Sequence, residues 1–206
     1  MHIPTVTTDK IKLVEFQEAL QAANTPNDSY DINKWLYAPN FYSEYRYILG
    51  TRGKNPLICI GINPSTAEPN NLDNTLKSVE RIALGNGFDS FIMFNVYAQR
   101  ATSPDDMEKM CNQQLHEENM KAFEYVLSIS DKPVVWAAWG AIIEKRKYLF
   151  DCLRDMLQLG QRYGATWSCA GAITKKGHPH HPLYLRKDEK LKPFDVEAYL
   201  EGSYDK

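Results

Sequence analysis

Apolar runs of strand length alternate with longer stretches of helical spacing along most of the chain. The runs that predict strands are apolar on both faces, as buried parallel strands are, and occupy residues 57–62, 91–96, 133–139 and 166–170. Helices are predicted between them, at residues 74–86, 104–129 and 141–159. Strands that alternate with helices in this way form a parallel sheet covered on both faces. The pattern therefore predicts an α/β fold of three layers, α/β/α, around a central, mainly parallel sheet of about four strands.

The 206 residues are expected to form a single domain, because the chain has no internal repeat and no low-complexity linker. Helical spacing at residues 8–23 and an aromatic-rich segment at residues 30–47 precede the first predicted strand. We expect residues 1–44 to form an N-terminal helix and aromatic cap on a core that spans residues 45–194. Residues 195–206 are expected to be a C-terminal tail.

Composition and charge exclude several classes of protein. The net charge is −2, so the chain lacks the overall basic field that drives strong non-specific binding to DNA, although a local basic groove is compatible with it. No apolar run approaches the roughly 20 residues that span a bilayer, and residues 1–10 lack the layout of a signal peptide. A cytoplasmic protein with no membrane partner is therefore expected.

The cysteines lie far apart, and none of them forms the Cys-x-x-Cys pair that is typical of zinc sites and iron–sulfur clusters. This spacing predicts neither a metal nor a cofactor, and it suits a reducing compartment. Cys59 lies inside the first apolar run and is expected to be a small buried hydrophobe.

Polar residues and turn residues stand where the predicted strands end. Because the carboxyl ends of parallel strands meet at one edge of a sheet, residues far apart in the sequence are expected to converge on one pocket there. The strand-end residues are, in chain order, Gly61, Ile62, Asn63, Pro64, Ser65, Asn95, Trp139 and Gly140, followed by a loop rich in histidine and proline at residues 177–184.

These four signals, in this order, resemble the motifs of the uracil-DNA glycosylase superfamily over roughly residues 45–194. Residues 61–65 resemble its water-positioning motif, in the form with asparagine in place of aspartate. The strand ending at Asn95 resembles the one whose asparagine reads the Watson–Crick edge of a pyrimidine. Trp139-Gly140 is similar to the Leu-Leu-Trp-Gly strand, and residues 177–184 to the His-Pro-Ser-Pro-Leu loop that contacts the base. More closely, the whole pattern resembles an uncharacterised bacterial and phage family assigned to that superfamily.

The resemblance implies a role for each group. Asn63 would orient a water molecule, and Asn95, with one amide donor and one acceptor, would read the edge of a flipped base. His178 would donate to a base oxygen as negative charge develops on the leaving base. The further substrate contacts implied are Gly61, Ile62, Pro64, Ser65, Tyr97, His181, Leu183 and Tyr184.

The histidine loop leaves its register open. His178-Pro179 and His181-Pro182 both match the start of the family's loop, and His180 competes with them. We favour His178 for the pocket, with Leu183 or Tyr184 as a wedge in the duplex. Surface histidines in a proline-rich loop are the alternative.

Two further assignments stay open. The aromatic residue that stacks on the flipped base is Tyr97, Tyr45 or Tyr47, all of which are equally suited to core packing. Asp73 either supplies the carboxylate that the first motif lacks or caps the helix that follows, and Asn74 is an alternative cap.

The sequence thus predicts a glycosylase-like hydrolase that acts on a damaged or modified base in nucleic acid, DNA more than RNA. An alternative is a binding module that recognises a free nucleobase, a nucleotide or nucleic acid without cleavage. A third is an interaction protein that keeps the fold as a scaffold, because fold does not imply function.

Overall fold

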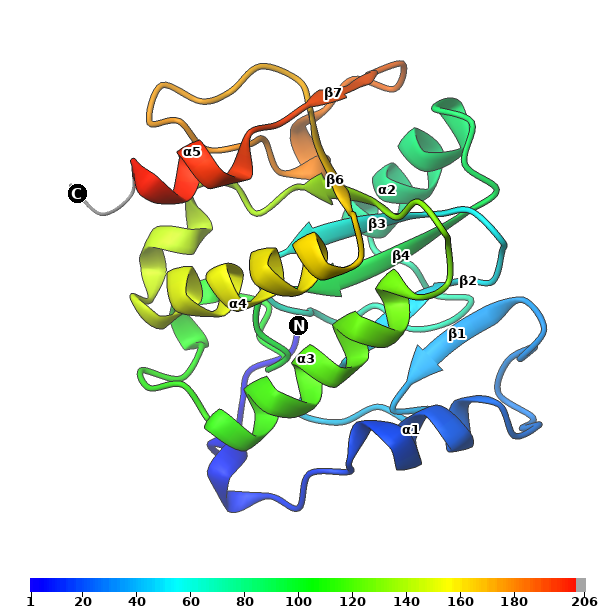
Figure 1. Ribbon diagram of the computed structural model, residues 1–206. Coiled ribbons are helices and arrows are strands. Elements are labelled where there is room, and N and C mark those ends of the chain that lie inside the picture. Colours follow the sequence, from blue (N-terminus) through cyan, green and yellow to red (C-terminus); the bar gives the residue numbers. More distant parts are fainter. Residues whose placement is uncertain (203–206) are drawn as a thin grey trace.

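The computed structural model describes residues 1–202 and consists of one sheet with helices against both of its faces (Figure 1). The sheet order is β1-β2-β4-β3-β5-β6-β7. The strands are β1 (Trp35–Ala38), β2 (Ile48–Thr51), β3 (Pro56–Gly61), β4 (Ser90–Asn95), β5 (Val134–Ala137), β6 (Thr166–Ala170) and β7 (Leu191–Pro193). The predicted α/β class is confirmed.

The centre of the sheet is parallel. β4, β3, β5 and β6 pair in parallel register and are the four strands that the apolar runs predict. For the sheet as a whole, the prediction of about four mainly parallel strands is wrong. β1 and β2 add antiparallel pairs on one side and β7 adds one on the other, so the sheet has seven strands and is mixed.

The three additional strands are short, which explains why hydrophobic periodicity does not predict them. β1 and β2 have four residues each and lie in or next to the aromatic-rich segment, where the composition of a strand and that of packed rings are alike. Trp35, Tyr37 and Leu49 are buried, so residues 1–44 contribute a core strand as well as a covering helix. β7 has three residues and ends at Pro193, as suits an edge strand.

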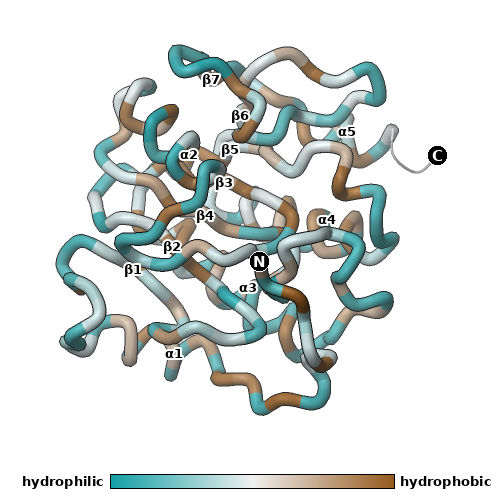
Figure 2. The backbone as a smooth tube through the Cα atoms, turned by 180° about the vertical axis from the view of Figure 1, so that it is seen from behind, coloured by the Kyte–Doolittle hydropathy of each residue, from teal (hydrophilic) through white to brown (hydrophobic). Residues whose placement is uncertain are grey.

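The helices cover the sheet in two groups. The buried residues of α1, α3, α4 and α5 belong to one core cluster and those of α2 to another. Figure 1 shows α3 and α4 side by side on one face, and Figure 2, seen from behind, shows α2 beside β3 and β4. The helices are α1 (Phe16–Ala23), α2 (Asn74–Gly85), α3 (Gln113–Leu127), α4 (Tyr148–Arg162) and α5 (Val196–Glu201).

The predicted C-terminal tail is in part a packed helix. Asp195 caps α5 by accepting a hydrogen bond from the Ala198 N–H at 2.9 Å, and Val196 and Leu200, four residues apart, are buried in the core. Residues 203–206 of the predicted tail lie outside the described residues.

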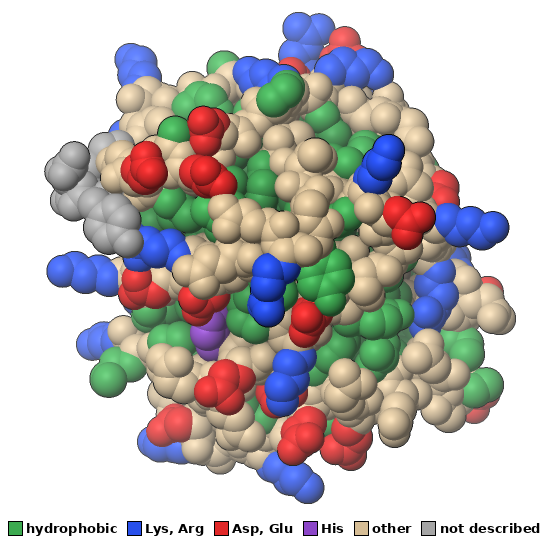
Figure 3. Space-filling model, viewed as in Figure 1, with side chains coloured by type: hydrophobic (Ala, Val, Ile, Leu, Met, Phe, Trp, Pro, Cys, Tyr) green, Lys and Arg blue, Asp and Glu red, His purple; other side chains and the backbone are tan. Residues whose placement is uncertain are grey.

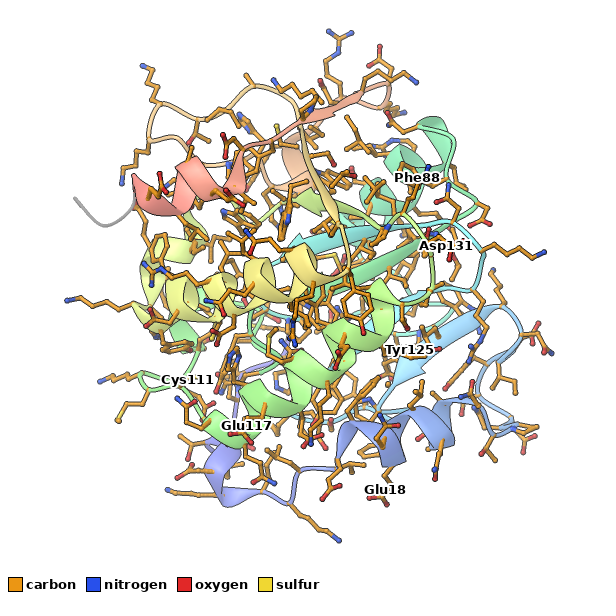
Figure 4. The ribbon with its side chains drawn as sticks, viewed as in Figure 1. Glu18, Phe88, Cys111, Glu117, Tyr125 and Asp131 are labelled. Carbon is orange, nitrogen blue, oxygen red and sulfur yellow. The ribbon has the colours of Figure 1, made fainter. Side chains whose placement is uncertain are left out.

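The helix-covered face in Figure 3 carries acidic and basic side chains interspersed with one another. In Figure 4, Glu18 on α1 and Glu117 on α3 project outward, and both are exposed. Tyr125 on α3 faces the sheet, with its ring 5.8 Å from that of Phe16. Within residues 1–202 no helix has the length and apolar character needed to cross a membrane.

Candidate active site

A cavity of about 380 Å³ lies at the carboxyl ends of β3 and β4. This is the edge of a parallel sheet where ligands bind in open α/β folds, and the volume is within the usual range for a small-molecule site. Its walls combine the residues that follow β3, the end of β4, the first turn of α2 and the histidine loop. The lining residues include Gly61, Ile62, Asn63, Pro64, Ser65, Asp73, Met93, Asn95, His181 and Leu183.

Asn95, the last residue of β4, has a buried amide side chain that no protein group satisfies. The residue is 1% exposed, and neither Oδ1 nor Nδ2 has a hydrogen-bond partner among the described residues. Buried polar side chains without partners are rare in folded proteins. Since Asn95 also lines the cavity, its amide offers an unused donor and an unused acceptor to a ligand.

Gly61 makes room for this amide. It pairs with Asn95 across the parallel ladder of β3 and β4. A Cβ atom at position 61 would lie 3.1 Å from Asn95 Oδ1 and 2.5 Å from Met93 Cε. The glycine of the first motif therefore acts by leaving space where the Asn95 amide and the Met93 side chain meet.

Asn63 is held in place by the backbone. Its Nδ2 donates to Ala101 O at 2.7 Å and to Pro64 O at 3.2 Å. The donor of the amide is thereby engaged, so the oxygen Oδ1 is the atom left to accept a hydrogen bond from a ligand or a water molecule. This arrangement suits the predicted water-orienting role better than a role in reading a base.

Asp73 fulfils one of the two roles that the sequence left open, and its position is compatible with the other. Its Oδ1 accepts from the Leu76 N–H at 2.9 Å, so Asp73 caps α2. It also lines the cavity, where it is the one carboxylate among the described lining residues. No hydrogen bond or ion pair of its second oxygen occurs within residues 1–202, which leaves a carboxylate oxygen for the chemistry of the site.

Of the histidines in the loop at residues 177–184, His181 lines the cavity, and His178 does not. The preference for His178 is wrong. That side chain is 3% exposed, and its two ring nitrogens lie 2.8 Å from Tyr199 Oη and 2.8 Å from Glu144 Oε1. These contacts with α5 and the 140–145 segment anchor the start of the loop.

His181 is placed by several contacts of its loop. The Pro182 carbonyl accepts from Ser78 Oγ on α2 at 2.8 Å. Gly140, with a φ of 60°, lies so close that a Cβ there would be 3.5 Å from His181 Cβ. The Leu183 N–H approaches His181 Nδ1 at 3.4 Å, which favours the neutral tautomer with its proton on Nε2. Burial lowers the pKa of His181, with Asp73 opposing the shift.

The predicted stacking aromatics do not line the cavity. Tyr97 is fully buried, and its hydroxyl donates to Glu108 Oε1 at 2.8 Å and accepts from the Asn112 N–H at 2.9 Å. Tyr45 and Tyr47 are core residues whose hydroxyls bond to Val14. The large apolar side chains of the lining are aliphatic instead: Ile62, Leu76, Met93, Ile142 and Leu183.

Leu183 and Tyr184, the two predicted wedge residues, differ in position. Leu183 lines the cavity and is 45% exposed, whereas Tyr184 is 77% exposed and is not a lining residue. Leu183 therefore keeps its place at the mouth of the cavity. Tyr184 is a surface residue whose ring lies 6.1 Å from that of His181.

Arg46 is the one charged residue among the described lining residues that the sequence pattern did not indicate; the others are Thr75, Leu76, Met93, Ala101, Thr102, Pro104 and Ile142. Arg46 is 1% exposed and precedes β2 within the aromatic-rich segment. The sequence carries one indication of this role, an arginine between two aromatic residues, Tyr45 and Tyr47, that are expected to be buried. Arginine is almost never fully buried without a partner, so a buried arginine there indicates a partner or a ligand. Within residues 1–202, no three His, Cys, Asp or Glu side chains come together as a metal-binding group.

No curated protein and no solved structure matches the chain. A family model described as "Protein of unknown function (DUF1643)" matches residues 46–183, about two thirds of the sequence. The match begins at Arg46 and ends at Leu183, and so encloses every residue named above as lining the cavity. The chain belongs to the DUF1643 family.

Proposed function

We propose that the protein is a uracil-DNA glycosylase-like hydrolase that removes a modified or damaged base from nucleic acid. The observation that supports this most is the Asn95 amide, buried at the cavity with donor and acceptor both unused. A base with an amide-like edge supplies the complementary acceptor and donor. A buried amide that stabilised only the fold would be expected to have partners in the protein.

Base entry moves Met93. The Met93 Cε atom lies beside Gly61 on the side where Asn95 Oδ1 lies, and the Asn95 amide is buried. Methionine is unbranched and changes rotamer readily, so an incoming base displaces it at small cost. The aliphatic residues of the cavity then provide apolar contacts for the base.

His181 stabilises the leaving base. Cleavage breaks the bond between the sugar C1′ and the base nitrogen, and the bonding electrons stay on the base. The neutral imidazole, with its proton on Nε2, donates to a base oxygen as this negative charge develops. A preorganised donor of this kind typically contributes about a hundredfold to a thousandfold in rate.

Asn63 and Asp73 act on the water. Asn63 Oδ1 accepts from one water proton and so directs the water oxygen toward C1′. The uncommitted oxygen of Asp73 takes the second proton as the water oxygen bonds to C1′, since an amide is not a base at neutral pH. This division of roles gives the site a carboxylate although its first motif carries asparagine.

A binding module is the second candidate, and one observation favours it. Acidic and basic side chains are interspersed over the face in Figure 3, and the net charge is −2, which is weak support for a protein that scans long nucleic acids. In this alternative the cavity binds the base with the same contacts, and Asp73 only caps α2.

The experiment incubates purified protein in excess over oligonucleotides that carry uracil, hypoxanthine or other modified bases, as DNA and as RNA, and measures free base and bound fraction. Asp73→Asn keeps a residue that caps helices well but removes the carboxylate that accepts the water proton. It should therefore slow excision about a hundredfold or more without weakening binding of the oligonucleotide. Asp195→Asn is the matched control, because Asp195 caps α5 with the same geometry away from the cavity. Binding without release of base by the unmodified protein would reject the hydrolase in favour of the binding module.

A further inference from the structure

Two buried arginines lie together beneath the first motif. Arg46 is 1% exposed and Arg100 is fully buried. Both donate through Nη1 to the Ala67 carbonyl, Arg46 at 3.1 Å and Arg100 at 3.4 Å. Two like charges are thus held in one region of low dielectric, which is unfavourable unless negative charge is close.

No carboxylate forms an ion pair with either arginine within the part of the chain that the structure describes. In the same part of the chain, the Nε atom of each arginine is buried without a hydrogen-bond partner. Burial, followed by the nearby Arg100 charge, lowers the pKa of Arg46 to about 9, so the guanidinium remains charged at neutral pH. The charge is therefore kept, and the nearby Asp73 carboxylate, which raises the pKa of Arg46, opposes the lowering only in part and forms no ion pair with Arg46.

The two arginines differ in what surrounds them. Arg100 donates to the Tyr37 hydroxyl at 3.1 Å, and its guanidinium carbon lies 4.3 Å from the centre of the Tyr42 ring. Arg46 has no aromatic face against it among the described contacts and lines the cavity. Of the pair, Arg46 is the one placed to meet a ligand.

The cavity wall near Arg46 also favours negative charge. Asn74 and Thr75, in the first turn of the 12-residue helix α2, line the same cavity. The partial positive charge of a helix N-terminus adds to that of a guanidinium. Asp73 offsets part of this field, but its Oδ1 is engaged with the Leu76 N–H and it makes no ion pair with Arg46.

We propose that Arg46 binds the phosphoryl group of a ligand whose base is read by Asn95, so that the cavity accepts a phosphorylated nucleoside unit and discriminates against a free nucleobase or nucleoside. The proposal rests on the proposed function for the base and on Arg46 for the phosphoryl group. Arginine suits this role because its planar fork donates two parallel hydrogen bonds to phosphate oxygens. The phosphoryl group is either the terminal phosphate of a mononucleotide or an internal phosphodiester.

The test measures affinity by calorimetry for deoxyuridine, deoxyuridine 5′-monophosphate, deoxyribose 5-phosphate, inorganic pyrophosphate and a single-stranded trinucleotide with internal deoxyuridine. The unmodified protein should bind a phosphorylated probe about tenfold to a hundredfold more tightly than deoxyuridine, the range for a hydrogen bond to a charged group. Arg46→Met, which keeps length and apolar volume, should abolish that preference, and Arg46→Lys should keep part of it. The monophosphate binding more tightly than the trinucleotide indicates a terminal phosphate, and the reverse indicates a phosphodiester.

Arg52→Met is the matched control. Arg52 follows β2 as Arg46 precedes it, and it donates to backbone carbonyls, including Ile32 O at 2.7 Å, away from the cavity. This variant should keep the full preference for phosphate. If Arg46→Met does not fold, the Arg46→Lys variant and the unmodified protein still test the proposal, because the affinities of all probes are measured for both proteins.

The outcomes separate this inference from the proposed function. Equal affinity of the unmodified protein for deoxyuridine and its monophosphate, or no binding of any phosphorylated probe, overturns the Arg46 site. Pyrophosphate and deoxyribose 5-phosphate could bind as tightly as the monophosphate, and this binding could be lost in Arg46→Met. That result would support the Arg46 site and reject the reading of a base by Asn95. A phosphate preference that Arg46→Met retains also overturns the inference.

Discussion

Replacing Asn95 with leucine should make the protein more stable and unable to recognise its ligand. The Asn95 side chain is 1% exposed, and both of its amide atoms lack partners. A buried amide without hydrogen bonds costs about 1–3 kcal/mol relative to an apolar side chain of similar size. For a domain of this size, each kcal/mol shifts Tm by about 2–4 °C. Asn95→Leu should therefore raise Tm by several degrees.

Asn119→Leu provides a control of opposite sign. Asn119, on α3, is fully buried and its Oδ1 also lacks a partner, but its Nδ2 donates to Asn95 O at 3.0 Å and to Val96 O at 3.4 Å. Removing this donor leaves buried carbonyl oxygens unsatisfied and should lower stability by about 1–3 kcal/mol. Thermal unfolding of both variants by calorimetry, with ligand affinity measured on the same samples, checks the pair of predictions. A loss of stability in Asn95→Leu equal to that in Asn119→Leu would refute the reasoning, because the Asn95 amide would then be satisfied within the fold.

The remaining predictions concern the groups next to this amide. Gly61→Ala should lower Tm modestly, because the new Cβ would lie 2.5 Å from Met93 Cε, which is flexible and can move. It should weaken base binding strongly, because the same Cβ would lie 3.1 Å from Asn95 Oδ1. Calorimetry together with a binding titration separates the two effects. Met93→Ala should speed ligand association by uncovering the Asn95 amide, as stopped-flow fluorescence would detect; an unchanged association rate would contradict the role of Met93 as a cover. Because the pKa of His181 is lowered in the folded protein, the unfolded chain binds a proton more readily. His181 should therefore contribute stability above its unfolded pKa of about 6.5 and lose that contribution as pH falls through the lower pKa of the folded state. When Tm is measured against pH, the Tm of the unmodified protein should fall more steeply below about pH 6.5 than that of His181→Gln.

Local sequence patterns predict the part of the site that belongs to the parallel strands. β3 and β4 are apolar throughout, and each ends at a recognisable turn or amide, so the convergence of Asn63 and Asn95 on one edge of the sheet follows from the pattern alone. The structure confirms that these two side chains line one cavity.

The histidine register depends on contacts that no local pattern contains. His178-Pro179 and His181-Pro182 are alike in sequence. What distinguishes them is the pairing of His178 with Glu144 and Tyr199, which are 34 and 21 residues away along the chain. Long-range partners of this kind become visible only when the fold is known.

The antiparallel side of the sheet was unpredictable for a related reason. β1 and β2 are four residues long and rich in aromatic and aliphatic side chains, so a strand and a packed cap have the same local pattern. The position of Arg46 at the cavity follows from β2 pairing with β4, and a strand pairing across more than 40 residues has no short-range signal.

The side-chain amide of Asn95 tests the central claim most directly. In a ¹⁵N-labelled sample its NH₂ resonances are assigned by their loss in Asn95→Leu, and they are then followed during titration with the base-bearing ligand that binds most tightly. Both resonances should shift markedly on binding, because a free donor acquires an acceptor on the base, while those of Asn24, an exposed asparagine on the far end of α1, stay in place. A saturable ligand that leaves the Asn95 resonances unchanged would contradict the reading of a base in this cavity.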